Sequence, residues 1–510
     1  MLAAVTVHNP VFHNPVFDWH ALAPDIILAV TIAAVLIADL VLPDRDAWQT
    51  SRIASIGVLA ALVPVATLAA SGHDRSMFGG AYAVDHYAIA LKGFFLVATY
   101  VTILLSVDYI NDGDYYKGEF YVLLLTSTFG MSVMASARDL ITLFVALETI
   151  SIPTFILATF RKHDRRSNEG GVKYYLIGVL SSALMLYGMS LIFGITGSTK
   201  LSEIASYVSA NGTSSLLTVA IFFSLIGFAF KVSAVPFHFW APDTYEGAPT
   251  PVTAFLSVAS KAGGFVALIN IIYFGFYANG AGAHAWWAAV LVLAALSMTV
   301  GNLAALRQTN IVRMLAYSSV AQGGFMLVPF AAAGIAGANG HRDVAATAMS
   351  AVVIYLFVYG AMNLGAFAIV IAVARRTNRG DISSYAGLFA TSPALAVTMT
   401  LFMASLAGVP PLAGWFAKFV MFRAIIEAGT GWGVALGVLA AVNSVIAFFY
   451  YAGVTRRLWF DEPAPDAATT TTRMPVGITA AMGLMTAVVL VVGVYPQFFA
   501  RLGELAFQRT

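Results

Sequence analysis

The sequence predicts an all-α integral membrane protein of about 14 transmembrane helices, and three observations support this fold class. First, 59% of the 510 residues are hydrophobic and only 10% are charged, whereas soluble proteins carry about 25% charged residues. Second, the apolar residues form runs long enough to span a bilayer, which takes about 20 residues. Third, the connections between the runs are short, which indicates a single membrane domain, 1–510, without a soluble module.

Fourteen apolar spans follow one another along the chain. Three N-terminal spans belong to residues 1–118, and a C-terminal helix and tail occupy 475–510. Two groups of five spans lie between them, at 119–278 and 286–454. The predicted spans are 22–42, 53–71, 86–107, 119–136, 140–160, 172–196, 216–236, 250–278, 286–306, 311–333, 346–374, 394–428, 432–454 and 475–498.

The fourth span of each group is interrupted by proline and carries a lysine. Span 7 ends in FKVSAVP, and span 12 contains GVPPLAG at 408–414. Because five is an odd number of crossings, the second group would lie in the membrane upside down relative to the first. We therefore expect two inverted five-helix repeats, spans 4–8 and 9–13, with broken helices at spans 7 and 12, as in ion-translocating proteins.

The charges at the ends of the spans predict the orientation. The first 20 residues do not resemble a signal peptide, because Pro10 and Pro15 interrupt them and no Lys or Arg precedes Arg45. The loops on one side of the membrane, together with Arg313 in the first turn of the span at 311–333, hold 15 Lys and Arg residues, against six on the other side. The positive-inside rule therefore places both termini outside the cytoplasm. We assign no function to residues 1–20 or to the Thr-rich loop 461–474.

The composition argues against several kinds of site. Cysteine is absent, which excludes disulfides, iron–sulfur clusters and thiolate metal sites on this chain. The nine histidines lack metal-ligand spacing, so we expect no metal. Neither a GxGxxG motif nor a P-loop is present, so no nucleotide site is expected. The net charge of +2 gives no reason to expect nucleic acid as a partner.

Lysine and arginine are distributed differently. Five of the eight lysines stand in spans, whereas 18 of the 19 arginines stand in loops or, for Arg313, in the first turn of a span. Arginine keeps its proton at any accessible pH, but a desolvated lysine can release its proton near neutrality. The spans therefore hold the type of cation that can be discharged.

Glu148 is the one carboxylate that we place near the middle of a span, in LFVALETISIPTF at 143–155. A charge at mid-bilayer costs a few kcal/mol even on the lowest scales. An ion pair with a lysine at about 4 Å and an effective dielectric near 20 would contribute roughly 4 kcal/mol. We expect Glu148 to pair with a lysine on an ion path, with a structural salt bridge as the alternative.

Three lysines are the strongest candidates for proton transfer. Lys231 precedes Pro236, which removes a backbone hydrogen bond and leaves carbonyl groups that need protein or water. Lys261 lies near the middle of span 8 among small residues, too deep to reach the surface easily. Lys418 follows the break in span 12. Intramembrane ionisable groups of this kind commonly mark ion paths.

Three further residues are weaker candidates. Lys173 opens span 6 near its cytoplasmic end, where snorkelling to the interface explains its position well. Lys92, in the outer part of span 3, is expected to be an interfacial anchor. His238 follows the break in span 7, in PFHFWAPD. It could relay protons or cap a carbonyl beside the aromatic belt.

These residues lie in stretches that resemble the antiporter-like membrane subunits of the proton-pumping NADH:quinone oxidoreductase, respiratory complex I. Within that family the N-type subunits are the most similar, because a lysine stands at 418 and the chain ends soon after span 14. The resemblance covers much of 140–425 but neither 1–20 nor 461–474. The stretches that carry it are ALETISIPTF, GGVKYYLIG, FKVSAVPFHFWAPDTYEGAPTPVTAFLSVASKAGGF, NLAALRQTNIVRMLAYSSVAQGGFML, RGDISSYAGL and SLAGVPPLAGWFAKF.

The resemblance implies roles for particular residues. It matches the family's ionisable positions in spans 5, 6, 7, 8 and 12 to Glu148, Lys173, Lys231, Lys261 and Lys418. It also implies that the chain translocates protons and holds no cofactor, while NAD, FMN, iron–sulfur clusters and quinone belong to partner subunits. The implied partners are the M-type subunit and the small membrane subunits, in the bacterial inner (plasma) membrane.

Two other functions remain compatible with the same residues. One is a subunit of an Mrp-type cation/proton antiporter, which is driven by an ion gradient. The other is a proton-pumping subunit of a membrane hydrogenase. A scaffold that transports nothing fits poorly, because it does not explain why lysine rather than arginine stands in the spans.

Overall fold

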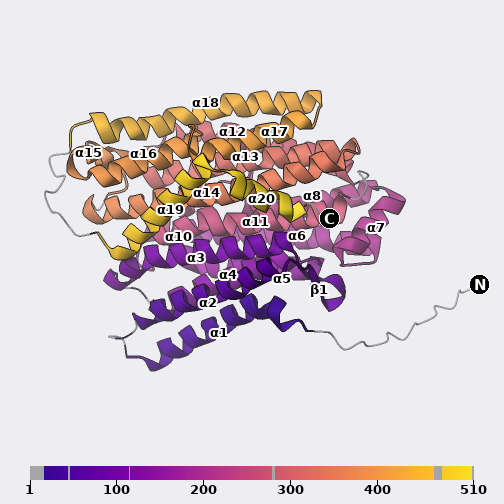
Figure 1. The fold of residues 1–510 in the computed structure, drawn as a ribbon, viewed down its shortest axis with the longest axis horizontal. Coiled ribbons are helices and arrows are strands. Elements are labelled where there is room, and N and C mark those ends of the chain that lie inside the picture. The colour runs from indigo at the N-terminus through magenta and orange to yellow at the C-terminus, as the bar shows by residue number, and fades with distance from the viewer. Residues whose placement is uncertain are drawn as a thin grey trace, which may run out of the picture.

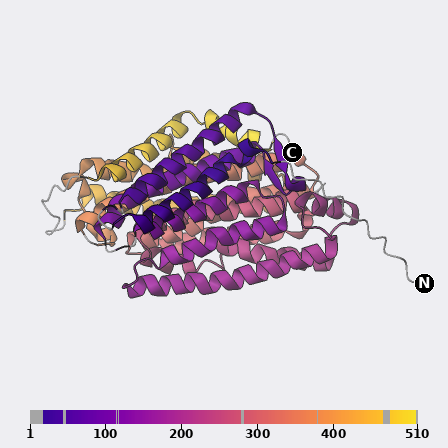
Figure 2. The same cartoon turned by 90° about the horizontal axis from the view of Figure 1, so that it is seen from below.

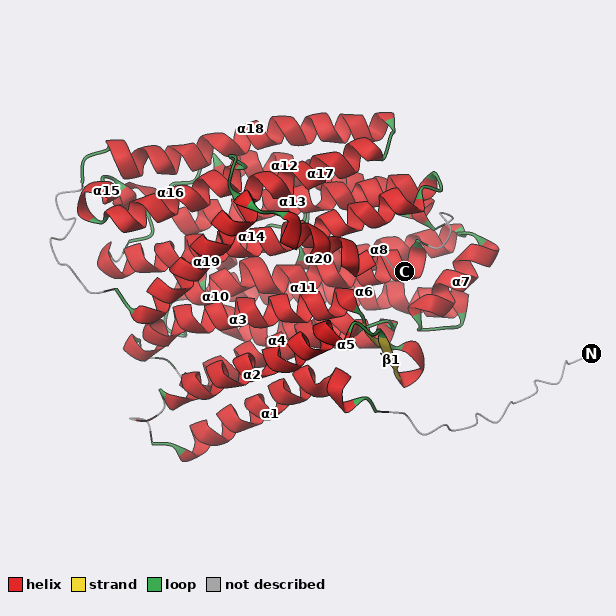
Figure 3. Cartoon of the chain, viewed as in Figure 1, coloured by secondary structure: helices red, strands yellow, loops and turns green. Residues whose placement is uncertain are grey.

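The structure, a computed structural model, describes residues 17–43, 46, 48–113, 115, 117–277, 282–377, 379–463 and 474–507. Within them, 12 helices are long and apolar enough to cross a membrane. The helices run roughly side by side, from α1 at one edge of the molecule to α18 at the other (Figures 1 and 2). Helix is the dominant element throughout (Figure 3). The predicted all-α membrane fold is confirmed, whereas the exact number of crossings and the inverted repeats remain predictions.

The N-terminal part contains three long helices and a small hairpin that we did not predict. Asp18 caps the first helix by accepting a hydrogen bond from the Ala21 amide, and Asp85 caps the third by accepting one from Ala88. The hairpin connects the second helix to the third. These elements are α1 (Trp19–Val41), α2 (Gln49–Ser71), β1 (Arg75–Met77), β2 (Tyr82–Val84) and α3 (His86–Asp112).

The next part contains the first broken helix. Its first half ends at Lys231, about one turn before Pro236, and its second half begins at Trp240. The predicted break is therefore present, but the helix stops earlier than the predicted end at residue 236. The helices of this part, including the short unpredicted α7, are α4 (Lys117–Ser136), α5 (Leu140–Ala158), α6 (Arg165–Thr196), α7 (Leu201–Asn211), α8 (Ser215–Lys231) and α9 (Trp240–Gly247).

The span around Lys261 contains two π-helical segments, which the sequence did not reveal. A π turn is a local widening of an α-helix and is frequent at functional sites. One such segment ends at Ser260, so Lys261 begins the next α-helical stretch. The consecutive segments are α10 (Thr250–Phe255), η3 (Leu256–Ser260), α11 (Lys261–Ile269) and η4 (Asn270–Gly275).

The second broken helix lies in the C-terminal half. Its two parts are separated at 408–412, as the GVPPLAG motif predicts. A separate helix follows α19 and was not predicted. The elements after residue 282 are η6 (Ala283–Ala285), α12 (Trp287–Ala305), α13 (Ile311–Ala338), α14 (Arg342–Thr377), η7 (Ile382–Tyr385), α15 (Leu388–Thr391), α16 (Pro393–Ala407), α17 (Ala413–Glu427), α18 (Gly431–Phe460), α19 (Val476–Val494) and α20 (Gln497–Phe507).

The core of the molecule runs along three spans. An apolar stretch of 18 residues in each of Thr250–Gly275, α13 and α14 is completely buried, whereas only about a third of such a stretch is buried in α1, α2 and α6. The outer helices expose many large apolar side chains, as a lipid-facing surface requires. Lys231, Lys261 and Lys418 are therefore buried in an interior that the peripheral helices separate from lipid.

Candidate functional site

Lys231 lies at the C-terminal end of α8 and is buried. Its Nζ donates hydrogen bonds to Ser151 Oγ of α5 at 3.0 Å and to the Tyr174 hydroxyl of α6 at 3.4 Å. Gly264 of α11 leaves room for the side chain, because a Cβ there would come within 2.8 Å of Lys231 Cγ. Three helices therefore surround this amine, and the groups it contacts are neutral hydroxyls.

Lys261 contacts the backbone of a different helix. Its Nζ donates to the Ser319 carbonyl of α13 at 2.7 Å and also to the Ser319 hydroxyl. Gly323, one turn further along α13, leaves room for the Val232 carbonyl, since a Cβ there would lie 3.2 Å from that oxygen. The same Cβ would lie at ordinary contact distance, 3.9 Å, from the Lys261 Nζ. The residue after Lys231 and the amine of Lys261 thus meet the same short stretch of α13.

Lys418 reaches back to the break in its own span. Its Nζ donates to the carbonyl of Ala407, the last residue of α16, at 2.7 Å and lies 5.0 Å from the centre of the Phe325 ring. The final carbonyls of a helix lack partners within the helix and carry partial negative charge. The break therefore creates the acceptor that this lysine uses.

Two of the three buried lysines contact α13. Ser319 accepts from Lys261, and Phe325 faces Lys418 six residues later, a rise of about 9 Å along the helix. Lys231, Lys261 and Lys418 are only 3%, 2% and 6% exposed, respectively. Among the described residues, no carboxylate lies within 4 Å of their amino groups. Each amine nevertheless has a polar partner rather than purely apolar surroundings.

Glu148 does not form the direct ion pair that we expected. It is half-buried and accepts a hydrogen bond from Ser182 Oγ of α6 at 2.6 Å. Within the described part of the chain, Glu148 and Lys231 are not within ion-pair distance, because the amine of Lys231 turns to Ser151 instead. Ser151 lies three residues beyond Glu148 on α5, about 4.5 Å along the helix axis. The carboxylate is therefore roughly one turn away from the group that Lys231 contacts.

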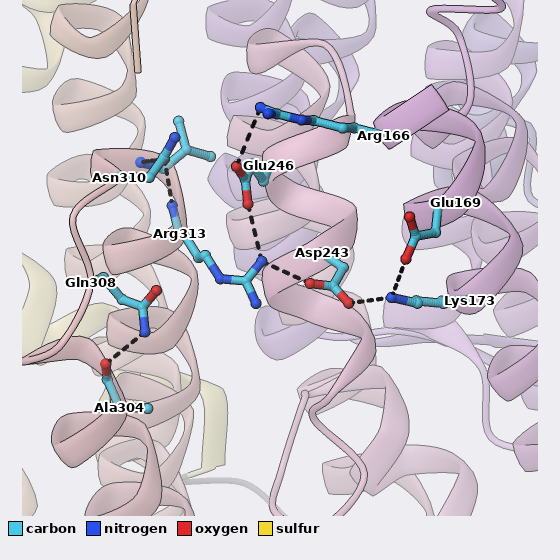
Figure 4. Close-up of polar contacts among 10 residues, drawn as sticks. Arg166, Glu169, Lys173, Asp243, Glu246, Ala304, Gln308, Asn310 and Arg313 are labelled. Carbon is cyan, nitrogen blue, oxygen red and sulfur yellow. Dashed lines mark hydrogen bonds and ion pairs between the residues drawn. The ribbon is translucent and has the colours of Figure 1, made fainter. Parts of the chain in front are cut away.

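Lys173 lies in a charged cluster at the end of the helix bundle (Figure 4). Its Nζ donates to Glu169 Oε1 and to Asp243 Oδ2, both at 2.7 Å, and its side chain is 42% exposed. Burial alone would raise the pKa of the Asp243 carboxyl, but hydrogen bonds from Lys173 and Arg313 outweigh it and lower that pKa below its ordinary value. Asp243 therefore stays ionised at neutral pH.

His238 lies in the non-helical segment between α8 and α9. Its side chain is half-buried, and its Nδ1 has no hydrogen-bond partner among the described residues. An unpaired buried nitrogen of this kind is a position where an internal water is expected. The geometry does not decide between the relay and the capping role, and both remain predictions.

Lys92 is not the interfacial anchor that we predicted. It is fully buried, and its Nζ donates to Asp25 Oδ2 and to the Tyr82 hydroxyl, both at 2.7 Å. Tyr82 and Ser132 also donate to the Asp25 carboxylate. The sequence contained the signal, because an acid and a base each lie near the outer end of an apolar span, but it did not show that the two spans are neighbours.

Comparison with known proteins identifies relatives of the whole chain. The family model described as NADH:quinone oxidoreductase/Mrp antiporter, TM matches residues 137–444. NADH-quinone oxidoreductase subunit N of Trichlorobacter lovleyi is 38% identical over 490 residues, which are 96% of this chain and 96% of that protein. The matched region contains all six residues that we proposed for proton transfer, whereas Asp25 and Lys92 lie outside it.

Solved structures agree with these relatives. A chain of respiratory complex I from Thermus thermophilus superimposes with a TM-score of 0.76 at 31% identity, covering 94% of this chain and 99% of that one. A chain of the Mrp complex from Dietzia sp. DQ12-45-1b gives a TM-score of 0.80 at 20% identity, covering 96% of this chain and 97% of that one. At that identity the second match shows a shared fold alone.

Proposed function

Because this chain belongs to the NADH:quinone oxidoreductase/Mrp antiporter family, we propose that it is the N-type, proton-translocating membrane subunit of an NADH:quinone oxidoreductase. The observation that carries the proposal is the burial of three lysines, Lys231, Lys261 and Lys418, whose amino groups contact neutral polar groups in the interior of the membrane domain. A buried cation without an anion is costly. Amines in such positions are suited to taking up and passing on a proton rather than keeping it.

The proposed path starts at the break between α8 and α9. A proton from the cytoplasm reaches Lys231 through water around this break, where His238 has an unpaired ring nitrogen. Lys231 holds the proton while the Glu148 carboxylate is drawn toward it. When that carboxylate moves away, the proton passes through water to Lys261 and then to Lys418. Release occurs on the outer side, beyond the second break.

The energies are of a suitable size for this mechanism. Moving one proton against 100 mV costs about 2.3 kcal/mol. Bringing a carboxylate to about 4 Å from an ammonium at an effective dielectric near 20 contributes roughly 4 kcal/mol. Forming and breaking a single Glu148–Lys231 pair is therefore sufficient to drive the transfer of one proton, provided that the partner subunits drive the rearrangement.

The energy source and the setting follow from the same proposal. NADH oxidation and quinone reduction take place on other subunits, which hold NAD, FMN, iron–sulfur clusters and quinone, and this chain carries none of these groups. The chain is a multi-pass membrane protein related to subunits of a respiratory complex. We place it in a bacterial plasma membrane, with both termini outside the cytoplasm, beside an M-type subunit and the small membrane subunits.

The main alternative is a subunit of an Mrp-type cation/proton antiporter, and the fold supports it equally, with a TM-score of 0.80. The proton-pumping subunit of a membrane hydrogenase is a third candidate. Co-purification distinguishes them. Flavin and iron–sulfur subunits that oxidise NADH should accompany this chain if the proposal is correct, whereas hydrogenase subunits or antiporter subunits alone would support the other two.

The test of the proposal is Lys231→Met in the intact complex. Methionine keeps the length and apolar character of the side chain but cannot carry a proton. We expect the complex to assemble, while proton translocation per NADH oxidised in membrane vesicles falls at least several-fold. An unchanged proton yield would reject the role of Lys231. The matched control is Lys200→Met, because Lys200 is partly exposed and pairs with Glu203.

A further inference from the structure

The two prolines of the second helix break, Pro410 and Pro411, remove the donors of two backbone carbonyls. In a continuing α-helix each carbonyl accepts from the amide four residues later. For Leu406 and Ala407 those residues are the two prolines, which have no N–H group. A carbonyl inside a membrane domain must still be satisfied by protein or water. Ala407 accepts from Lys418 at 2.7 Å, so the carbonyl before it needs a different donor.

Gln322 of α13 supplies that donor. Its Nε2 donates to the Leu406 carbonyl at 3.2 Å, and the side chain is buried. An amide keeps both of its N–H groups at every accessible pH, so this hydrogen bond does not depend on a protonation state. The end of α16 is therefore held by two donors on neighbouring carbonyls, the neutral amide of Gln322 and the amine of Lys418.

Two tyrosines fix the orientation of this amide. The Tyr355 hydroxyl of α14 donates to Gln322 Oε1 at 2.7 Å, and Gln322 Nε2 also donates to the Tyr451 hydroxyl of α18 at 3.2 Å. The Tyr451 hydroxyl is itself hydrogen-bonded to Ser318 of α13. Because the oxygen and the nitrogen of the amide have different partners, the side chain cannot turn over without losing hydrogen bonds. Gln322 therefore connects α13 with α14, α16 and α18.

Gln322 stands on α13 between the residues that contact two of the buried lysines. Ser319, which accepts from Lys261, lies three residues before it, and Phe325, which faces Lys418, lies three residues after it. Residues three apart lie on the same side of a helix, about 4.5 Å from each other along its axis. Gln322 thus joins the stretch of α13 that binds Lys261 to the helix end that binds Lys418.

From these contacts we infer that Gln322 is a positioning residue for proton transfer between Lys261 and Lys418. By holding the end of α16 against α13, it fixes the place of the carbonyl that binds Lys418, and hence the distance that the proton has to cross. Gln322 does not carry the proton itself. A misplacement of about 1 Å can slow a reaction step about a hundredfold. The inference rests on the proposed function, because this distance matters only in a chain that passes protons between these lysines.

The chain contains a similar buried amide that serves as a control. Asn302 Oδ1 of α12 accepts from the Tyr450 hydroxyl at 3.1 Å. Its Nδ2 donates to the backbone carbonyl and to Oδ1 of Asn443, each at 3.1 Å. Like Gln322, this amide has a tyrosine on its oxygen and two acceptors on its nitrogen. Its hydrogen bonds join α12 to α18 and go to none of the candidate lysines. Asn302 therefore reports the cost of losing a buried amide as such.

Gln322→Met and Asn302→Leu test the inference in the intact complex. Both variants keep the approximate size of the side chain and remove its amide, so both should lower the midpoint of thermal unfolding. We expect NADH-driven proton translocation in vesicles to fall about tenfold in Gln322→Met, which corresponds to about 1.4 kcal/mol. The assembled fraction of Asn302→Leu should translocate normally. Equal losses in the two variants, or normal translocation in Gln322→Met, would overturn the inference.

The pH profile separates a positioning role from a general loss of stability. Displacing the carbonyl that binds Lys418 changes how firmly this amine holds its proton. The pH at half-maximal translocation should therefore shift in Gln322→Met, whereas Asn302→Leu should keep the original profile. A loss by the same factor at every pH in Gln322→Met would contradict the inference.

Tyr355→Phe and Tyr450→Phe repeat the comparison with milder changes. Each keeps the ring and removes the hydroxyl that donates to one of the amides, Gln322 or Asn302. We expect a several-fold loss of translocation and a shifted pH profile in Tyr355→Phe, and neither effect in Tyr450→Phe. Identical profiles in the two variants would contradict the inference. This pair also decides the matter if the Gln322→Met complex fails to assemble.

These experiments separate the inference from the proposed function. If Lys231→Met translocates protons at the normal yield, the proposed function fails. If Lys231→Met loses translocation while Gln322→Met and Asn302→Leu behave alike, only the role of Gln322 fails.

Discussion

The partners of a buried lysine distinguish a structural ion from a candidate proton carrier in this chain. Lys92 contacts a carboxylate, Asp25, and two further donors complete the hydrogen bonding of that acid. Lys231, Lys261 and Lys418 contact hydroxyls and backbone carbonyls instead. All four residues are buried lysines within apolar spans, so residue type and depth do not separate them. The groups that their amines contact do separate them.

This contrast predicts that Lys92 contributes to stability and not to transport. In Lys92→Met the Asp25 carboxylate would remain buried without its cation, which costs about 3–5 kcal/mol. We expect the midpoint of thermal unfolding of the purified complex to fall, while the proton yield of the assembled fraction stays normal. The Lys92→Met/Asp25→Asn pair removes both charges and should recover most of the stability. A lost proton yield in the assembled fraction would contradict this prediction.

Lys418→Arg tests whether discharge is required. Arginine would keep the cation near the Ala407 carbonyl but would not release its proton. We expect proton translocation to fall at least tenfold although the complex assembles, as measured by NADH-driven acidification of vesicles. Normal turnover would show instead that this position needs only a cation. Lys200→Arg, at a partly exposed surface pair, is the control.

The helix breaks lie next to two of the three buried lysines. α8 ends at Lys231 itself, and α16 ends immediately before the glycine that packs on Lys418. Carbonyls at such ends are tolerated within a membrane only when protein or water satisfies them. The span of Lys261 has a proline only at its start, Pro251, and a π-helical segment stands next to the lysine instead. Three interruptions of regular α-helix thus accompany the three lysines.

Gly408 is required at the second break for two reasons. Its φ of +92° is unfavourable for any residue with a Cβ, and an added Cβ would lie 2.7 Å from Lys418 Cδ. We expect Gly408→Ala to destabilise the protein by roughly 1–3 kcal/mol and to displace Lys418, which lowers proton translocation several-fold. Gly453→Ala is the matched control, because nothing lies within 4 Å of the added Cβ. Equal stability and translocation in the two variants would refute the expectation.

The arrangement of the whole chain in the membrane is open to a direct test. The sequence contains no cysteine, so a single introduced thiol reports its own exposure. His163, between α5 and α6, and His73, between α2 and the hairpin, are both exposed. We expect a membrane-impermeant thiol reagent to label His163→Cys from the cytoplasmic side and His73→Cys from the outer side. Labelling of both from the same side, or the reverse pattern, would overturn the predicted orientation.

Composition and local pattern were sufficient to predict the membrane class, the positions of the apolar spans and both helix breaks. These features depend on the residues within one segment, since a helix needs an uninterrupted apolar run and proline cannot donate the next hydrogen bond. The same local view identified Lys231, Lys261 and Lys418 as buried. It did not reveal the π-helical segments, which the packing of neighbouring spans accommodates.

Contacts between distant segments could not be read from the chain. Asp25 and Lys92 are 67 residues apart, and Asp243 lies 70 residues from both Lys173 and Arg313. The contact of Glu148 was not foreseen either, since its carboxylate accepts from Ser182 in this structure. Local sequence specifies which side chains are costly to bury, because that cost belongs to each side chain. Which partner offsets the cost is set by the packing of helices against one another, and this packing appears only in the folded molecule.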